Sequence, residues 1–145
     1  GIRIVKEFQP DLPKVRGDAN QLEQVFLNLI SNARDAMEKS ERKKELTITA
    51  SLLRHNGWND VEVMVKDTGN GIPRENLDKV FEPFFSTKEV GRGTGLGLSI
   101  CYGIIEAHGG RLEVESQVNE GTAFRVLLPV LSSHLGTALE WMVET

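Results

Sequence analysis

The 145-residue sequence predicts an α+β fold, a two-layer α/β sandwich in which helices cover one face of a mixed sheet. Two stretches have the apolar spacing of helices, and five shorter ones are rich in β-branched or alternating apolar residues. The strand-like stretches are 2–8, 45–53, 60–66, 111–117 and 122–128, and the helix-like stretches are 18–39 and 96–108. The length suits one compact domain, 1–129; the tail, 130–145, could dock as a helix, begin a further domain or be a frayed end.

The first strand, 2–8, is followed by a connection that prolines and a glycine interrupt. Asp18 is suited to cap the next helix, which we expect to extend to about Lys39. At about 100° per residue, apolar side chains gather on one broad face of this helix and amides on the other. The apolar face comprises Leu22, Val25, Phe26, Leu29, Ala33, Ala36 and Met37, and the polar strip Gln21, Gln24, Asn28, Asn32 and Asp35.

The middle of the chain is predicted as a β-hairpin whose second strand ends in a glycine-rich turn. Asn56-Gly57 is a pair typical of tight hairpin turns. The second strand, 60–66, alternates apolar and polar residues and runs directly into Asp67-Thr-Gly-Asn-Gly71. Pro73 is suited to the first turn of a short helix over 74–80.

The last third is predicted to hold an irregular segment, a helix and a closing hairpin. Residues 81–95 combine aromatic residues with glycines and are expected to be irregular. The helix over 96–108 is expected to stop at Gly109-Gly110. The closing hairpin is expected to turn at Asn119-Glu120-Gly121.

Composition excludes several classes of protein. The net charge of −4 argues against nucleic-acid binding, and Cys101, the one cysteine, is expected to be a small buried residue rather than half of a disulfide. No apolar run reaches the length of a membrane span, so we expect a cytoplasmic location. The sequence has no P-loop, dinucleotide fingerprint, zinc cluster or serine-hydrolase elbow. Because it starts at Gly1 within a strand-like stretch, we expect a domain of a longer protein.

Three patterns suit nucleotide chemistry, each with an ordinary structural alternative. Glycines over 91–97 precede a helix whose free N–H groups could bind phosphate, or they form a flexible loop and cap. Asp67 ends a strand and could accept a hydrogen bond from an exocyclic amine such as that of adenine, or it makes an Asx-turn. Asn28 and Asn32 lie one helical turn apart and could offer amide oxygens to Mg²⁺, or they are solvated polar residues.

Taken together, the patterns resemble the catalytic, ATP-binding domain of sensor histidine kinases, within the GHKL superfamily that includes the ATPases of gyrase, MutL and heat-shock chaperones. The resemblance covers residues 1–129 and implies a Bergerat-type ATP-binding fold. Five motifs match in order: an N box from Asn28 to Ala36, a G1 box from Asp67 to Ile72, an F box from Phe81 to Lys88, a G2 box from Gly91 to Leu98 and a G3 element from Gly121 to Phe124.

The resemblance implies roles around the base and the metal. Asp67 would receive the adenine amino group, and Thr122 would help through a water. Asn32 would ligate Mg²⁺, Asn28 would arrange the metal and the phosphates, and Asp35 is a further candidate in the same motif. The remaining nucleotide-binding candidates of the G1 box are Gly69, Gly71 and Ile72.

The resemblance also implies an ATP lid over residues 82–94. Phe84 and Phe85 would anchor its base, and Lys88 and Arg92 would meet phosphate charge, completing a catalytic set with the two asparagines. The other nucleotide-binding candidates in and beside this lid are Thr87, Gly93, Thr94, Gly95, Leu96, Gly97 and Leu98.

The implied cofactors are ATP and Mg²⁺, and the implied reaction is transfer of the γ-phosphate to a histidine. Gyrase-type ATPases carry a glutamate where this chain has Asn28; an amide cannot take a proton from water, which favours transfer over hydrolysis. The residues that follow His55, His108 and His134 do not fit an acceptor motif, so these histidines are interpreted as incidental surface or helix-end residues.

The acceptor is therefore expected on an upstream dimerisation and phosphoacceptor helical domain, and a cognate response regulator is the other expected partner. We expect the isolated domain to be monomeric and the full-length protein to be a homodimer. Two alternatives stay open: a serine-directed kinase relative, and a degenerate module that binds a nucleotide or a partner without catalysis.

Overall fold

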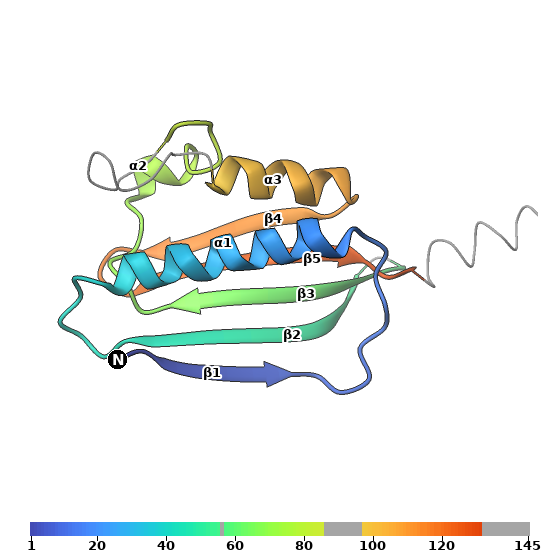
Figure 1. Ribbon diagram of the computed structural model, residues 1–145, viewed down its shortest axis with the longest axis horizontal. Coiled ribbons are helices and arrows are strands. Elements are labelled where there is room, and N and C mark those ends of the chain that lie inside the picture. Colours follow the sequence, from blue (N-terminus) through green and yellow to red (C-terminus); the bar gives the residue numbers. More distant parts are fainter. Residues whose placement is uncertain (56, 86–96, 132–145) are drawn as a thin grey trace, which may run out of the picture.

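The computed structural model of the chain describes all residues except 56, 86–96 and 132–145 (Figure 1). In chain order the elements are β1 (Arg3–Phe8), α1 (Ala19–Met37), β2 (Glu45–His55), β3 (Trp58–Asp67), α2 (Arg74–Leu77), α3 (Gly97–Ala107), β4 (Arg111–Gln117) and β5 (Gly121–Pro129). The described strands form a five-stranded sheet in the order β1-β2-β3-β5-β4, and α1 and α3 lie on one face of it. The predicted α+β class and the helix-covered mixed sheet are confirmed.

The sheet is mixed because β1 runs parallel to β2 while every other pair is antiparallel. Strand β3 pairs with β5, so a segment of more than 50 residues connects two strands that are direct neighbours. Val65 lies opposite Ile48 on β2 and Phe124 on β5. These three side chains belong to the core beneath the helices, as expected from the alternation along the strands.

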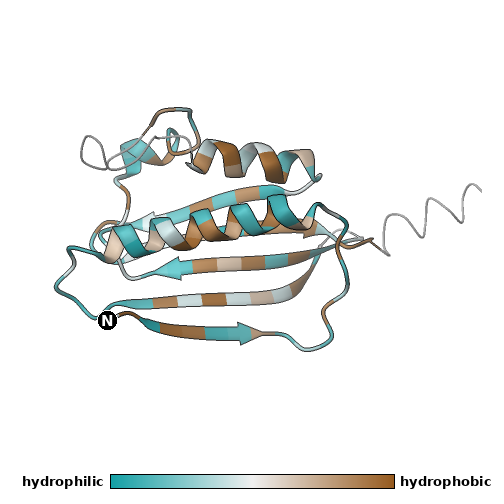
Figure 2. Cartoon of the chain, in the orientation of Figure 1, coloured by the Kyte–Doolittle hydropathy of each residue, from teal (hydrophilic) through white to brown (hydrophobic). Residues whose placement is uncertain are grey.

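Helix α1 supplies the other half of the core. The Asp18 carboxylate accepts the Gln21 N–H at 3.0 Å, so the predicted N-cap is confirmed. Its buried residues, Val25, Leu29, Ala33 and Met37, recur at a spacing of four and face the sheet. Figure 2 shows these apolar bands along α1 and across the strands beneath it. Cys101 and Ile105 of α3 are also fully buried and join the same core.

The clearest differences from the predicted boundaries are in the β2–β3 hairpin and in α2. The β2–β3 hairpin is longer than expected, and Gly57 adopts a positive φ of 79°, which suits a tight turn. Helix α2 ends at Leu77, earlier than expected. The chain beyond it continues through i→i+3 hydrogen bonds, Lys79 N–H to Asn76 O and Glu82 N–H to Lys79 O, both 2.9 Å, which form successive turns rather than an α-helix.

Parts of the sequence predictions lie outside the described residues, namely most of the irregular segment 81–95 and nearly all of the tail 130–145. Within the described ranges, the helices lack the combination of length and apolar character that crossing a membrane requires.

Candidate functional site

Asp67 is a buried carboxylate at the end of the central strand β3, with 3% of its surface exposed. Its Oδ1 accepts the Gly69 N–H at 2.8 Å and the Thr122 N–H at 3.3 Å. The first of these bonds is the Asx-type contact that was the alternative to ligand binding. Both bonds end on Oδ1, however, so Oδ2 is left for a ligand and the two interpretations are compatible.

Burial has a measurable consequence for this carboxyl group. Desolvation raises the pKa of Asp67 above its usual value, and the N–H groups of Gly69 and Thr122 oppose that rise only in part. Asp67 and Thr122 are the polar side chains that are buried in the described part of the chain. A desolvated carboxylate beside a strand end is a feature of binding and catalytic sites rather than of ordinary cores.

The loop after Asp67 is held between α1 and the β4–β5 turn. Gly69 approaches α1 so closely that an added Cβ would lie 2.6 Å from the Ala36 carbonyl oxygen. Gly71 has a φ of +77°, and a Cβ there would collide with the Gln117 carbonyl. Asn70 completes the link, because its N–H donates to Ala36 O at 3.2 Å and its carbonyl accepts the Asn119 N–H at 2.8 Å.

A serine that sequence reasoning did not single out joins this loop to Thr122. Ser116 Oγ accepts the Ile72 N–H at 2.7 Å, donates to Gly121 O at 3.0 Å and lies 2.8 Å from Thr122 Oγ1. Its position opposite Thr122 in the β4–β5 register was the available signal. That signal requires knowing which strands pair.

The polar strip of α1 holds the two asparagines of the predicted metal site. Asn28 and Asn32 are both half-buried. The Asn28 Nδ2 donates to Cys101 Sγ at 3.6 Å, and that thiol donates to Val25 O at 3.8 Å. Cys101 is fully buried, as predicted, and burial raises the pKa of its thiol. Since the amide nitrogen of Asn28 is committed to sulfur, its oxygen is the atom that can meet a hard cation.

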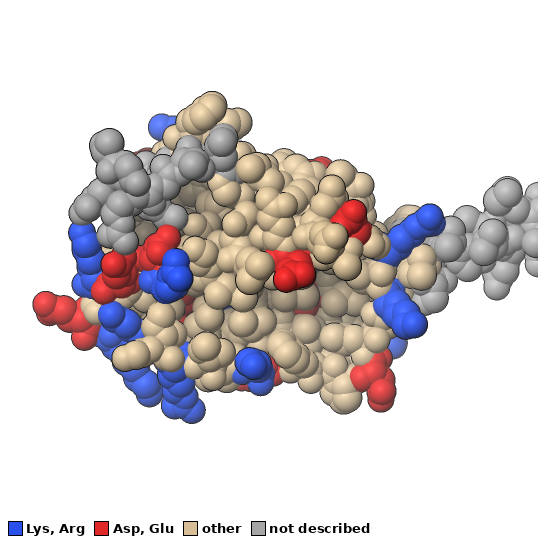
Figure 3. Space-filling view, viewed as in Figure 1, with Lys and Arg blue, Asp and Glu red and all other residues tan. Residues whose placement is uncertain are grey.

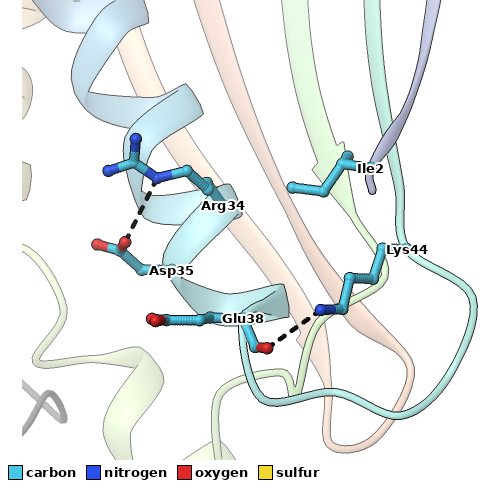
Figure 4. A pocket seen from close by; sticks show the side chains of 5 residues that line it. All are labelled: Ile2, Arg34, Asp35, Glu38 and Lys44. Carbon is cyan, nitrogen blue, oxygen red and sulfur yellow. Dashed lines mark hydrogen bonds and ion pairs between the residues drawn. The ribbon is translucent and has the colours of Figure 1, made fainter.

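Asp35 lies at a different opening. It lines a pocket of about 360 Å³ with Ile2, Arg34, Glu38 and Lys44, between α1 and the start of β1 (Figure 4). The Asp35 Oδ1 is 3.7 Å from Arg34 Nε, and Lys44 Nζ donates to Glu38 O at 3.1 Å. Asp67, Asn28 and Asn32 are not among the lining residues, so this pocket is separate from the Asp67 loop.

Known proteins with this sequence pattern share the geometry. Residues 17–132 match the family described as histidine kinase-, DNA gyrase B-, and HSP90-like ATPases. The chain belongs to this ATPase family. Sensor kinase CckA of Brucella abortus is 46% identical over an alignment of 129 residues, and the alignment covers 83% of this chain and 14% of CckA. Sporulation kinase C of Bacillus subtilis is 44% identical over an alignment of 133 residues, which covers 90% of this chain and 29% of that kinase.

Solved structures of histidine kinases have the same fold as this chain. The catalytic domain of histidine kinase ThkA superposes with a TM-score of 0.73 at 35% identity, covering 89% of this chain and 80% of that domain. Full-length ShkA in complex with AMPPNP superposes with a TM-score of 0.74 at 31% identity, covering 89% of this chain and 26% of ShkA. The chain thus covers 80% of the ThkA catalytic domain but less than a third of CckA and of sporulation kinase C.

In this ATPase family member, the described part of the lid region begins after a well-packed aromatic residue. The Phe81 ring lies 5.1 Å from the Tyr102 ring and 6.3 Å from the Phe124 ring, centroid to centroid. Phe85 is half-buried, whereas Phe84 is 75% exposed, so Phe81 is the described aromatic residue that ties the segment to the core. The predicted lid residues that lie outside the described ranges are Thr87, Lys88, Arg92, Gly93, Thr94, Gly95 and Leu96.

Helix α3 begins at Gly97, directly after those residues, and Leu98 packs against the core. At its other end, His108 Nε2 accepts the Asp18 N–H at 3.0 Å, and Nδ1 lies 2.7 Å from Ile104 O. Nδ1 therefore carries the proton. His108 directly follows the last residue of α3, as the helix-end interpretation expected, and its ring also links the end of α3 to the start of α1.

Proposed function

We propose that this chain is the ATP-binding catalytic module of a two-component sensor histidine kinase. It binds Mg-ATP and delivers the γ-phosphate to a histidine of a separate helical domain. The buried Asp67 carboxylate carries this proposal, because its Oδ1 is occupied by two backbone N–H groups and its Oδ2 is not. The family match supports a nucleotide as the ligand.

Base recognition follows from the chemistry of Asp67. A carboxylate oxygen accepts a hydrogen bond from the exocyclic amine of adenine, whereas the carbonyl at the same position of guanine offers no proton. Oδ1 cannot swing away, since Gly69 and Thr122 hold it. Oδ2 is thereby oriented before the nucleotide arrives, which lowers the entropic cost of binding.

Phosphate binding is assigned to α1 and to the start of α3. The amide oxygens of Asn28 and Asn32 are hard ligands that suit Mg²⁺, and Asn28 is oriented by its bond to Cys101. Bound Mg²⁺ neutralises charge on the phosphates during transfer. The N–H groups of Gly97 and Leu98 stand in the first turn of α3, where the positive end of the helix suits phosphate oxygens.

Transfer, rather than hydrolysis, is supported by the side chain at Asn28. An amide has no basicity with which to activate water, whereas a neutral imidazole is nucleophilic at pH 7 without help from a base. The phosphate acceptor is then a histidine on the helical dimerisation domain, and the phosphoryl group is transferred from that histidine to a response regulator. Because phosphoryl transfer needs little covalent work from the protein, positioning and charge are what this module supplies.

A calorimetric titration with ATP, ADP and GTP, with and without Mg²⁺, tests the proposal. We expect adenine-selective binding that Mg²⁺ strengthens for ATP. Phosphotransfer from [γ-³²P]ATP to an added histidine-containing helical hairpin of a relative, with acid lability of the product as the readout, separates histidine from serine as the acceptor. Adenine-selective binding without any transfer would favour a degenerate module. The absence of nucleotide binding would refute the proposed function.

A further inference from the structure

We propose that Ser116 is a positioning residue that makes the Thr122 hydroxyl an obligate hydrogen-bond acceptor and so sharpens the selectivity of the base pocket for adenine over guanine. This inference rests on the proposed ATP binding. Ser116 contacts Thr122 and Ile72, and the hydroxyl groups of Ser116 and Thr122 have only one proton each to donate.

The Ser116 hydroxyl has one proton and three polar neighbours. The Ile72 N–H can only donate, so Ser116 Oγ accepts at 2.7 Å. The Gly121 carbonyl can only accept, so Ser116 Oγ gives it the single proton over 3.0 Å. The third neighbour, Thr122 Oγ1 at 2.8 Å, must therefore be the donor in its contact with Ser116.

This count determines what Thr122 can offer to a ligand. Thr122 donates its hydroxyl proton to Ser116 Oγ, so only the lone pairs of Thr122 Oγ1 remain for a ligand. Thr122 is 5% exposed and lies next to Asp67, with its N–H on Asp67 Oδ1. The proposed base-binding site thus offers two acceptors, Asp67 Oδ2 and Thr122 Oγ1, and no hydroxyl donor from Ser116 or Thr122.

A pocket with two acceptors discriminates between purines by what it leaves unpaired. The amino group of adenine supplies protons, directly or through a bridging water. The carbonyl oxygen of guanine would face two further oxygens and receive a proton from neither of them, and a buried unpaired acceptor is costly. Asp67 disfavours guanine directly, and Ser116 adds to this discrimination by keeping Thr122 Oγ1 an acceptor, without contacting the base.

Removing the serine hydroxyl should release the Thr122 proton. In Ser116→Ala, Thr122 can rotate and donate to a ligand, so the carbonyl of guanine finds a partner. We expect GTP to bind more tightly than to the unsubstituted chain, and the ratio of ATP to GTP affinity to fall by about tenfold, the worth of one hydrogen bond. Ser116→Thr keeps the hydroxyl and should restore the ratio. Competition by GTP against a fluorescent ATP analogue measures both affinities.

Thr68→Ala is the matched control. The Thr68 hydroxyl also joins loop backbones, accepting the Glu45 N–H at 3.0 Å and donating to Lys43 O at 2.8 Å, but it does not contact Thr122. Loss of this hydroxyl should lower the affinities for ATP and GTP by the same factor, because a loosened loop gives GTP no additional hydrogen bond. An unchanged affinity ratio in Ser116→Ala, with ATP still bound by the unsubstituted chain, would overturn the role of Ser116 alone. Failure of the unsubstituted chain to bind ATP would overturn the proposed function as well.

A second variant keeps the inference testable if Ser116→Ala does not fold. Thr122→Val removes the acceptor itself and leaves the shape nearly unchanged. We expect the ATP to GTP ratio to fall in this variant, and circular dichroism monitors its folding. A folded Thr122→Val chain with the original selectivity would refute the acceptor role of Thr122 and with it the inference.

Discussion

The two ends of the strand order, β3–β5–β4 and β1, are built differently. At the β3–β5–β4 side, the helices cover the strands, and Asp67 and Thr122 are buried with hydrogen-bonded partners. At the β1 edge, Ile4 and Phe8 are each 57% exposed although the strand alternation places them on the helix-facing side. Figure 3 shows charged side chains concentrated toward the two ends of the molecule and a largely uncharged middle.

The two regions differ in the interactions that determine their stability. A desolvated carboxylate destabilises the side of the sheet that holds it, and dense packing by Val65, Phe124 and Val126 offsets that cost. The β1 edge holds no buried polar group among the described residues, and its apolar side chains gain little from partial coverage. The part of the sheet that holds the candidate site is therefore densely packed around a desolvated carboxylate, whereas the β1 edge is more exposed to solvent.

The largest effect is expected from Asp67→Asn. We expect ATP affinity to fall by about 100-fold, because the position of the accepting Oδ2 can be taken by an amide nitrogen that donates. The Asn oxygen can keep both bonds from Gly69 and Thr122, so the fold should persist. Calorimetry measures the affinity, and urea unfolding measures the stability.

The same variant tests the electrostatic cost through pH. The pKa of Asp67 is raised in the folded state, so the favourable contribution of its protonated form is fully present below the unfolded pKa and is lost as pH rises through the folded pKa. The unfolding free energy of the unsubstituted chain should therefore decrease relative to Asp67→Asn as pH rises from about 3 to about 7. An unsubstituted chain that gains stability over the variant in this range would contradict the burial argument.

A backbone change in the loop after Asp67 should lower the unfolding free energy substantially. Gly71→Ala forces a side chain onto a residue with a φ of +77° and into the Gln117 carbonyl. We expect a loss of about 2–3 kcal/mol in unfolding free energy, measured by urea denaturation. Gly57→Ala is the control, because Gly57 has a similar φ of +79° but open space around it, so only the backbone strain should remain.

Metal dependence gives a more moderate test. In Asn32→Ala we expect the Mg²⁺-dependent part of the ATP affinity to shrink by about tenfold while the affinity without Mg²⁺ changes little. Titrations with and without the ion measure the two parts. An equal loss under both conditions would remove Asn32 from the metal site and leave it as an ordinary contact.

The smallest effect is expected at the β1 edge. Phe8→Ser should lower the unfolding free energy by less than about 1 kcal/mol, because more than half of the ring is already in water. Val65→Ala on β3, where the side chain is 1% exposed, should lower it by about 2–3 kcal/mol despite the smaller change in volume. A reversed order would show that the edge is covered in solution.

Local patterns in the sequence were sufficient for much of the fold. The Asp18 cap, the apolar face of α1 and the alternating strand before Asp67 each depend on neighbours a few residues away, and all were predicted. The alternatives for Asp67 could not be separated, because one carboxylate oxygen makes the Asx-type contact and the other does not. That distinction depends on Thr122, which is 55 residues away.

Other features required the tertiary arrangement. Ser116 is an unremarkable strand serine until β4 lies beside β5 and the loop at Ile72 closes onto it. The Cys101 contact with Asn28 likewise joins residues that are 73 positions apart. The contact of His108 with the Asp18 backbone joins residues 90 positions apart, so the sequence indicated only that His108 lies at a helix end.

The neighbouring placement of β3 and β5 also sets the order in which this protein can be completed. The β2–β3 and β4–β5 hairpins are local and can form within about 1–10 μs, whereas pairing β3 with β5 must close a long intervening loop. On a ribosome that adds about 5–20 residues per second, Thr122 emerges several seconds after Asp67. A nucleotide can therefore stabilise only the finished sheet, and it cannot act as a template for the first half of the chain.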